Sequence, residues 1–217
     1  MKKLDRTLAT TPVCLSKFSY LTQDWDSVKT RQKAKIWIEL DKFQEKFCVY
    51  CESKAERGKG TGHIEHFFHK GNVAYKPLTF SWDNLFGCCD SRGHCGHFKD
   101  EILPKGQKKA YDPNKLIKPD VDDPEKFLQF FISGKVEAKK NLDVVDKEKA
   151  QLTISALNLD CSELNLSREA QLKRYNARLL VLTSVELSQV VLDEFDKLYH
   201  EAMNVAHRTA LKQAIPW

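Results

Sequence analysis

The chain has 217 residues, of which 41% are hydrophobic and 30% are charged. This is enough apolar material for a buried core and enough charge for a solvated surface. No apolar run approaches the roughly 18 residues of a membrane-spanning helix, and charged side chains interrupt residues 1–18, where a signal peptide would be apolar. The sequence therefore predicts a soluble, cytoplasmic protein with no membrane partner.

The positive charge is concentrated in the first half of the chain. The formal net charge is +5 overall, with 20 Lys+Arg against 13 Asp+Glu in residues 1–110 and 15 against 17 in residues 111–217. Because basic surface neutralises phosphates, a nucleic acid is the expected partner of the first half. Ordinary solvated lysines are the alternative interpretation.

Hydrophobic periodicity predicts an α+β fold that is mainly α. A helical pattern opens the chain, two short strand patterns flank a loop, and a Ser-Gly turn marks a hairpin further on. Four prolines indicate a surface connection over 104–124. The expected elements are a helix over 27–47, strands over 63–69 and 85–89, a short helix over 96–103, a hairpin over 127–139, and helices over 147–159, 168–182 and 185–213.

The seven cysteines indicate a metal site, because disulfides are rare in the cytoplasm. A Cys-x-x-Cys pair begins at Cys48, and three more cysteines follow some forty residues later. Cys88 and its neighbour face opposite sides of a strand, so only one of the two can join the metal. Free thiols or a redox pair are the alternative, and Cys14 and Cys161 are expected to be buried small hydrophobic residues. We expect one structural Zn²⁺ bound by Cys48, Cys51, Cys89 and Cys95.

A histidine-rich segment, HIEHFFH, lies between the two cysteine groups. A carboxylate such as that of Glu65 suits a hard divalent cation, either Mg²⁺ or Mn²⁺. An imidazole with a near-neutral pKa, such as that of His66, can deprotonate water. Glu65 is therefore the expected ligand of a catalytic metal, and His66 is the expected general base of phosphodiester cleavage.

The remaining site residues are expected to assist this pair. The amide of Asn84 can hold the intervening loop shut and fix the orientation of the base. The second metal ligand should come from the following helix, where His97 is the first choice and His94 the alternative. Lys99 is expected to contact a phosphate, and so are Arg57 and Lys59 unless their loop is merely solvated. His63 and His69 are expected to lie on the surface or to pack in loops, and His200 and His207 are expected to pack or face solvent in the last helix.

Four segments carry a family resemblance. CVYCE (48–52), IEHF (64–67), WDNL (82–85) and CGHFK (95–99) resemble HNH endonucleases with a ββα-metal core. More narrowly, the layout is similar to PtuB, the HNH subunit of Septu-type and retron-associated anti-phage systems. The similarity continues into YDPN (111–114), the ISGKV hairpin and the LNL segment (157–159), so it covers most of the chain.

This resemblance implies a nuclease that acts on DNA, or alternatively on RNA, as the effector of a bacterial defence complex. It implies a partner ATPase subunit of the PtuA type, together with the retron reverse transcriptase and its RNA and DNA in some systems. It also implies three segments: a helical segment over 1–47, a zinc-braced nuclease core over 48–110, and a hairpin followed by a helical, partner-binding scaffold over 111–217.

One departure from the family pattern affects the metal site. The pattern usually closes with Cys-x-x-Cys-Asn, whereas here Cys89 and Cys95 are separated by five residues and Gly96 follows. The inserted SRGH shifts the register of the next helix, so either His97 or His94 can be the last metal ligand. The competing hypothesis is a catalytically inactive, zinc-stabilised binding subunit, consistent with the long helical tail. The presence of Glu65 and His66 together favours the nuclease.

Overall fold

The structure, a computed structural model, describes residues 1–58, 60–101 and 110–217. It is a mixed α+β fold with two small antiparallel sheets, as the sequence predicts. Short 3₁₀ turns join the elements. The helices and strands are α1 (Thr30–Gln44), β1 (Gly62–His66), β2 (Leu85–Cys89), α2 (Cys95–Lys99), α3 (Pro124–Phe127), β3 (Leu128–Phe130), β4 (Val136–Ala138), α4 (Val144–Ala156), α5 (Ser162–Thr183), α6 (Gln189–Ala202) and α7 (Arg208–Ala214).

Helix α1 forms where the sequence predicts a helix, and its apolar face packs against β2. Trp37 is buried on this face, whereas Ile38 is 60% exposed. The Gln44 side chain accepts a hydrogen bond from the Gly87 amide at 2.7 Å and donates to the Gly87 carbonyl at 2.8 Å. A Cβ at Gly87 would lie 2.7 Å from the Trp37 ring, so a glycine is required for this close approach.

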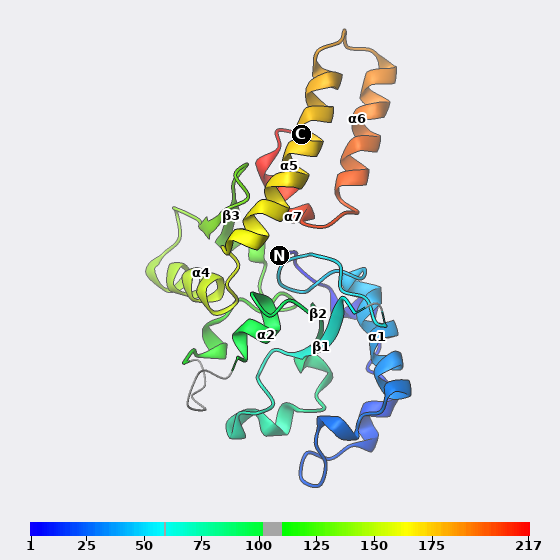
Figure 1. The fold of residues 1–217 in the computed structure, drawn as a ribbon, viewed down its shortest axis with the longest axis vertical. Helices are drawn as coiled ribbons and strands as arrows, with labels where there is room; N and C mark the ends of the chain where they lie inside the picture. The colour runs from blue at the N-terminus through cyan, green and yellow to red at the C-terminus, as the bar shows by residue number, and fades with distance from the viewer. Residues whose placement is uncertain (59, 102–109) are drawn as a thin grey trace.

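Strands β1 and β2 pair antiparallel, from Gly62 opposite Cys89 to His66 opposite Leu85. Helix α2 follows β2 and packs against it, which gives a ββα unit beside α1 (Figure 1). The strand predicted over 63–69 ends at His66, because its partner β2 begins only at Leu85, after a 3₁₀ turn, and the Asn84 side chain takes up the backbone groups of Phe68. Helix α2 also ends earlier than predicted, at Lys99. Residues 102–109 lie outside the described residues, and they include the last two residues of this predicted helix and the first part, 104–109, of the predicted proline-rich connection.

The C-terminal half contains a second hairpin and a helical bundle. Strands β3 and β4 form the hairpin predicted over 127–139, with a turn at Gly134. The single helix predicted over 185–213 is wrong, because the chain breaks between α6 and α7. At the break, His207 adopts φ 61° and its backbone amide donates to the Glu52 carbonyl at 3.2 Å. A contact with the cysteine-bearing segment thus overrides the helical periodicity.

Two apolar clusters fill the interior. The larger cluster draws residues from each of the segments 1–47, 48–110 and 111–217. The smaller cluster lies between α5, α6 and α7 and includes Leu172, Tyr175, Leu179, Leu198 and Leu211. The α5–α6 hairpin projects away from the ββα unit (Figure 1). Among the described helices, none combines the length and the apolar character that a membrane span requires.

Candidate metal centres and the adjoining cleft

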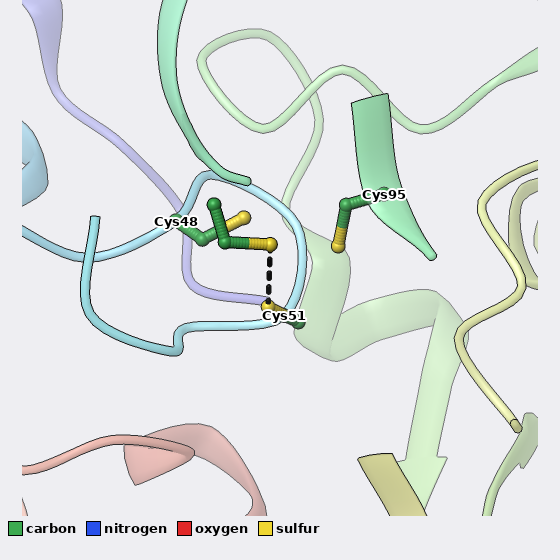
Figure 2. A group of neighbouring side chains, drawn as sticks. Cys48, Cys51 and Cys95 are labelled. Carbon is green, nitrogen blue, oxygen red and sulfur yellow. Dashed lines mark hydrogen bonds between the residues drawn. The ribbon is translucent and has the colours of Figure 1, made fainter. Parts of the chain in front are cut away.

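Four buried cysteines converge at the junction of the ββα unit and can bind a metal such as zinc. Their sulfur atoms all lie within 4.8 Å of one another, and Figure 2 shows three of them turned toward a common space. Thiolates bound to zinc at about 2.3 Å in a tetrahedron would be about 3.8 Å apart, which is the separation between Cys51 Sγ and Cys89 Sγ. The group is the one predicted from the sequence: Cys48, Cys51, Cys89 and Cys95.

Cys88 lies close to this group without belonging to it. Its sulfur is 3.7 Å from Cys48 Sγ and accepts a hydrogen bond from the Gly96 amide at 3.4 Å. Of the two adjacent cysteines, Cys89 belongs to the four-sulfur group, which is the choice made from the sequence. Cys14 is buried as expected, and Cys161 is half-buried.

The turn that carries Cys48 and Cys51 is held by both ends of the chain. The Glu52 carboxylate is buried, lies 3.4 Å from the amino group of Met1, and accepts hydrogen bonds from the amide and hydroxyl of Thr209 at 3.0 and 2.7 Å. His207 Nδ1 lies 2.9 Å from the Cys51 carbonyl oxygen. The helical half therefore supports the cysteine cluster directly, a role that no local sequence pattern indicates.

The two candidate histidine ligands are separated by the fold. His94 is buried, with Nδ1 3.1 Å from Cys95 Sγ and 3.8 Å from Cys89 Sγ. His97, in contrast, lies on the face of α2 that lines an open cleft. His94 therefore lies with the cysteines, and His97 is the histidine of this segment that is available to the cleft.

The cleft measures about 510 Å³ and is formed by β1, the loop after β1, and α2. It brings together three residues that the sequence singles out for catalysis, and basic side chains lie on its rim. Its lining comprises His63, Ile64, Glu65, His66, His69, Lys70, Arg92, Gly96, His97, Asp100 and Glu101.

Glu65 is 4% exposed and is ionised. Burial would raise the pKa of its carboxyl group, but the Lys99 ammonium and His63 outweigh burial and bring the pKa to about 2. Oε1 lies 3.0 Å from Lys99 Nζ and accepts from the Tyr50 hydroxyl at 3.3 Å, while Oε2 is 3.3 Å from His63 Nε2. A Cβ at position 96 would lie 2.4 Å from Oε2, so Gly96 makes room for this carboxylate.

His66 has a defined orientation and is neutral at pH 7. Its Nε2 lies 3.0 Å from the carbonyl oxygen of Thr79, so Nε2 carries the hydrogen and Nδ1 keeps its lone pair. Burial lowers the pKa of the imidazole to about 3. The Trp25 ring packs perpendicular to the imidazole, with the ring centroids 4.5 Å apart.

Asn84 fixes the loop that carries the carbonyl partner of His66. Its Oδ1 accepts from the Phe68 amide at 2.7 Å, and its Nδ2 donates to the carbonyls of Phe68 and Leu78, each at 3.1 Å. Leu78 immediately precedes Thr79, which accepts from His66. The structure thus provides the loop-holding contacts that the sequence led us to expect of Asn84.

A second group of possible metal ligands lies at the cleft and was missed by the sequence reasoning. His63 Nδ1 is 3.1 Å from Asp90 Oδ1, and His97 Nε2 is 3.7 Å from the same oxygen. The imidazole rings of His63 and His97 stack at 4.0 Å. His63 was expected to lie on the surface or to pack in a loop, and no role was predicted for Asp90. The only signal for this group is positional, because Asp90 directly follows β2 and His63 lies near the paired start of β1.

The residues that were expected to contact phosphate lie in different environments. Lys99 is wholly buried, and its ammonium donates to the carbonyls of His66 and Phe67 at 3.2 and 3.3 Å. The expectation of a direct phosphate contact by Lys99 is therefore corrected to a structural role. Arg57 is exposed beside the N-terminus of α1, where it donates to the Thr30 carbonyl at 3.5 Å. Lys59 lies outside the described residues.

No model of a protein family matches this sequence, and no curated protein shows significant similarity to it.

Proposed function

We propose that this protein is a metal-dependent endonuclease of the HNH type, with His66 as the general base. One observation carries the proposal: a neutral imidazole, oriented through Nε2, lies in a cleft that also contains Glu65 and His97. The β1–β2–α2 order around this cleft has the layout expected of a ββα-metal core. The family resemblance of the motifs supports the same assignment.

The chemistry assigned to His66 is the removal of a proton from water. With the hydrogen on Nε2 directed at Thr79, the Nδ1 lone pair is the atom that can accept this proton. A pKa of about 3 makes the ring neutral but only weakly basic. A phosphate group in the cleft would add negative charge beside the ring, which raises the pKa of the imidazole and strengthens the base.

The other groups of the cleft fit a phosphodiester substrate and a divalent cation. When bound, a cation such as Mg²⁺ or Mn²⁺ supplies charge neutralisation at the phosphate and at the leaving oxygen. His97 and the acidic side chains around it are donors of the type such a cation uses. Lys70 and Arg92 on the rim offer positive charge to neighbouring phosphates of the backbone.

A cleavage assay tests the proposal. Purified protein, with and without its partner, is offered duplex DNA, single-stranded DNA and cellular RNA in Mg²⁺, in Mn²⁺ and in EDTA. We expect endonucleolytic products that require a divalent cation. The nucleic acid that is cut identifies the substrate, and an absence of cleavage under every condition contradicts the proposal.

The role in anti-phage defence is a second part of the proposal and rests on the family resemblance. A co-encoded ATPase subunit would bind the helical half, where the outer end of the α5–α6 hairpin exposes Val181, Val185, Leu187 and Val190. A truncation near residue 147 would remove this surface, but it would also remove α7, which contacts the cysteine-bearing turn. The double variant Leu187→Asp, Val190→Asp is therefore the sharper test. It should abolish co-purification with the ATPase and leave the zinc content unchanged, and retained co-purification would contradict this interface.

The alternative function is that of a zinc-stabilised binding subunit without catalysis. The 2% exposure of His66 is the observation that favours it, since a buried base has limited contact with water. Full anti-phage activity of the double variant Glu65→Ala, His66→Ala would support this alternative. Loss of that activity, with folding and zinc content retained, would support the nuclease.

A further inference from the structure

We propose that the cleft binds its divalent cation through His63, Asp90 and His97, with Glu65 positioning His63 instead of contacting the metal. The donor set further implies a transition-metal ion, with Mn²⁺ bound more tightly than Mg²⁺. The function of this ion rests on the proposed nuclease activity, whereas its binding does not.

The geometry of the three side chains suits a single ion. Their ligand atoms all lie within 4.8 Å of one another, and Asp90 Oδ1 is 3.1 Å from His63 Nδ1 and 3.7 Å from His97 Nε2. Ligands bound at about 2.1 Å to one ion are about 3 to 4 Å apart, so Asp90 Oδ1 already lies at that spacing from both histidines.

The fold supplies the three ligands from three different elements. His63 is on β1, Asp90 follows the last residue of β2, and His97 is on α2. The pairing of Gly62 with Cys89 fixes His63 and Asp90 at the same end of the hairpin. Cys95 in the four-cysteine cluster fixes the start of α2, two residues before His97. The strand pairing and the four-cysteine cluster together therefore fix the positions of the three ligands relative to one another.

The hydrogen bonding of Glu65 argues against this residue as a direct ligand. Its Oε1 is occupied by the Lys99 ammonium and the Tyr50 hydroxyl. Its Oε2 faces His63 Nε2 at 3.3 Å. A cation placed on this carboxylate would lie close to the buried ammonium of Lys99 and would be repelled by it.

The contacts of both ring nitrogens of His63 fit the proposed arrangement. Nε2 lies 3.3 Å from Glu65 Oε2 and Nδ1 lies 3.1 Å from Asp90 Oδ1, so an imidazolium can donate to both carboxylates, whereas a neutral ring that keeps Nε2–H presents its Nδ1 lone pair beside Asp90. A cation bound to Nδ1 and to Asp90 Oδ1 would take the place of the proton on this nitrogen. A carboxylate that holds the far nitrogen of a metal-binding histidine is a recurrent arrangement in metalloproteins, and it raises the basicity of the ligand.

The donor types decide the class of metal. Mg²⁺ prefers a complete set of oxygen ligands, whereas imidazole nitrogen favours first-row transition metals. Two imidazoles and one carboxylate therefore favour Mn²⁺, Co²⁺, Ni²⁺ or Zn²⁺ over Mg²⁺. The chain would accordingly hold two ions of different character, one closed in by four thiolates and one open to the cleft.

Electron paramagnetic resonance of bound Mn²⁺ tests this assignment on the full-length, zinc-loaded protein. We expect one Mn²⁺ per chain, with electron spin echo modulation from two imidazole nitrogens. His63→Gln and His97→Gln should each remove one nitrogen, and Asp90→Asn should weaken Mn²⁺ binding by about tenfold or more. Mg²⁺ should displace Mn²⁺ only at a concentration at least about tenfold higher. The exposed His200→Gln on α6 is the matched control and should retain both nitrogens.

Three results would overturn the assignment: no Mn²⁺ binding by the zinc-loaded protein, a single nitrogen that persists in His63→Gln, or unchanged affinity in Asp90→Asn. Zinc content measured on each variant shows whether the fold is intact. If Mn²⁺ binds through two nitrogens and no nucleic acid is cleaved, the nuclease proposal fails and the metal site stands. If cleavage depends on His66 and one nitrogen is found, the metal site fails and the nuclease stands.

Discussion

Lys99 and Glu65 form an ion pair inside the ββα unit, with Nζ 3.0 Å from Oε1 and the two side chains 0% and 4% exposed. The same ammonium donates to the carbonyls of His66 and Phe67. Helix α2 is thereby tied to the end of β1, at the residue that we assign as the general base. The position of His66 therefore depends on a buried charge that does not itself face the cleft.

Replacing Lys99 by methionine should be strongly destabilising. The substitution leaves the Glu65 carboxylate buried without its partner, which costs about 3 to 5 kcal/mol of unfolding free energy. Urea denaturation of Lys99→Met, Glu65→Gln and the double variant measures the effect and the coupling. The double variant should lose less than the sum of the single losses. A loss below about 1 kcal/mol in Lys99→Met would contradict the structural role of this pair.

The zinc assignment distinguishes two adjacent cysteines. Cys89→Ala removes one of four thiolates, so the zinc content should fall well below one ion per chain and the melting temperature should drop. Cys88→Ala is the matched control, because Cys88 is equally buried and lies outside the four-sulfur group. It should retain one zinc and lose only about 1 kcal/mol through the cavity it creates. The reverse pattern of zinc contents would show that the wrong cysteine has been assigned.

Asn84→Ala should loosen the loop that holds His66. The substitution removes three hydrogen bonds and leaves the Phe68 amide and two carbonyls without this partner, at a cost of about 2 to 4 kcal/mol. Cleavage should fall as well, because Thr79 would no longer fix the imidazole of His66. Thermal unfolding and the cleavage rate are measured together. Unchanged stability would show that these hydrogen bonds are not important for the loop.

Stability should decline as the pH falls from about 6.5 toward 3, in part because of His66. Burial holds the pKa of His66 at about 3, below its usual value of 6.5, so the unfolded chain binds the proton first. This contribution is fully present above pH 6.5 and is lost as the pH falls. Between pH 6.5 and 4.5, His66→Gln should lose roughly 2 kcal/mol less than the wild type. Parallel stability curves for the two proteins over this range would contradict the burial of a neutral imidazole.

Local patterns in the sequence predict most of the secondary structure and the four-cysteine site. The helical periodicity of α1 and the spacing of Cys48 and Cys51 are local properties of the sequence. Strand β2 likewise matches its predicted range. The break before His207 is not local, because it depends on a contact with Glu52 far away in the sequence. Local periodicity alone gives no account of such a contact.

The cleft was predicted only in part, for the same reason. Glu65, His66 and His97 are in one cleft as expected, since they belong to a single ββα unit. Asp90 and His63 become neighbours through the strand pairing, which brings residues far apart in the sequence to the same end of the hairpin. The burial of Lys99 depends on its contacts with Glu65 and with the His66 carbonyl on β1, and a basic residue next to an acidic one in the sequence gives no sign of these contacts.

The most direct test of the central claim compares the wild type with His66→Ala in the cleavage assay, using the partner-bound protein, Mn²⁺ and the preferred nucleic acid. Zinc content and melting temperature are measured on both proteins, with the exposed His200→Ala as the control variant. We expect His66→Ala to retain its zinc and to cleave about 10² to 10⁴ times more slowly than the wild type. Cleavage within about twofold of the wild-type rate, in the presence of metal, would contradict the assignment of His66 as the general base.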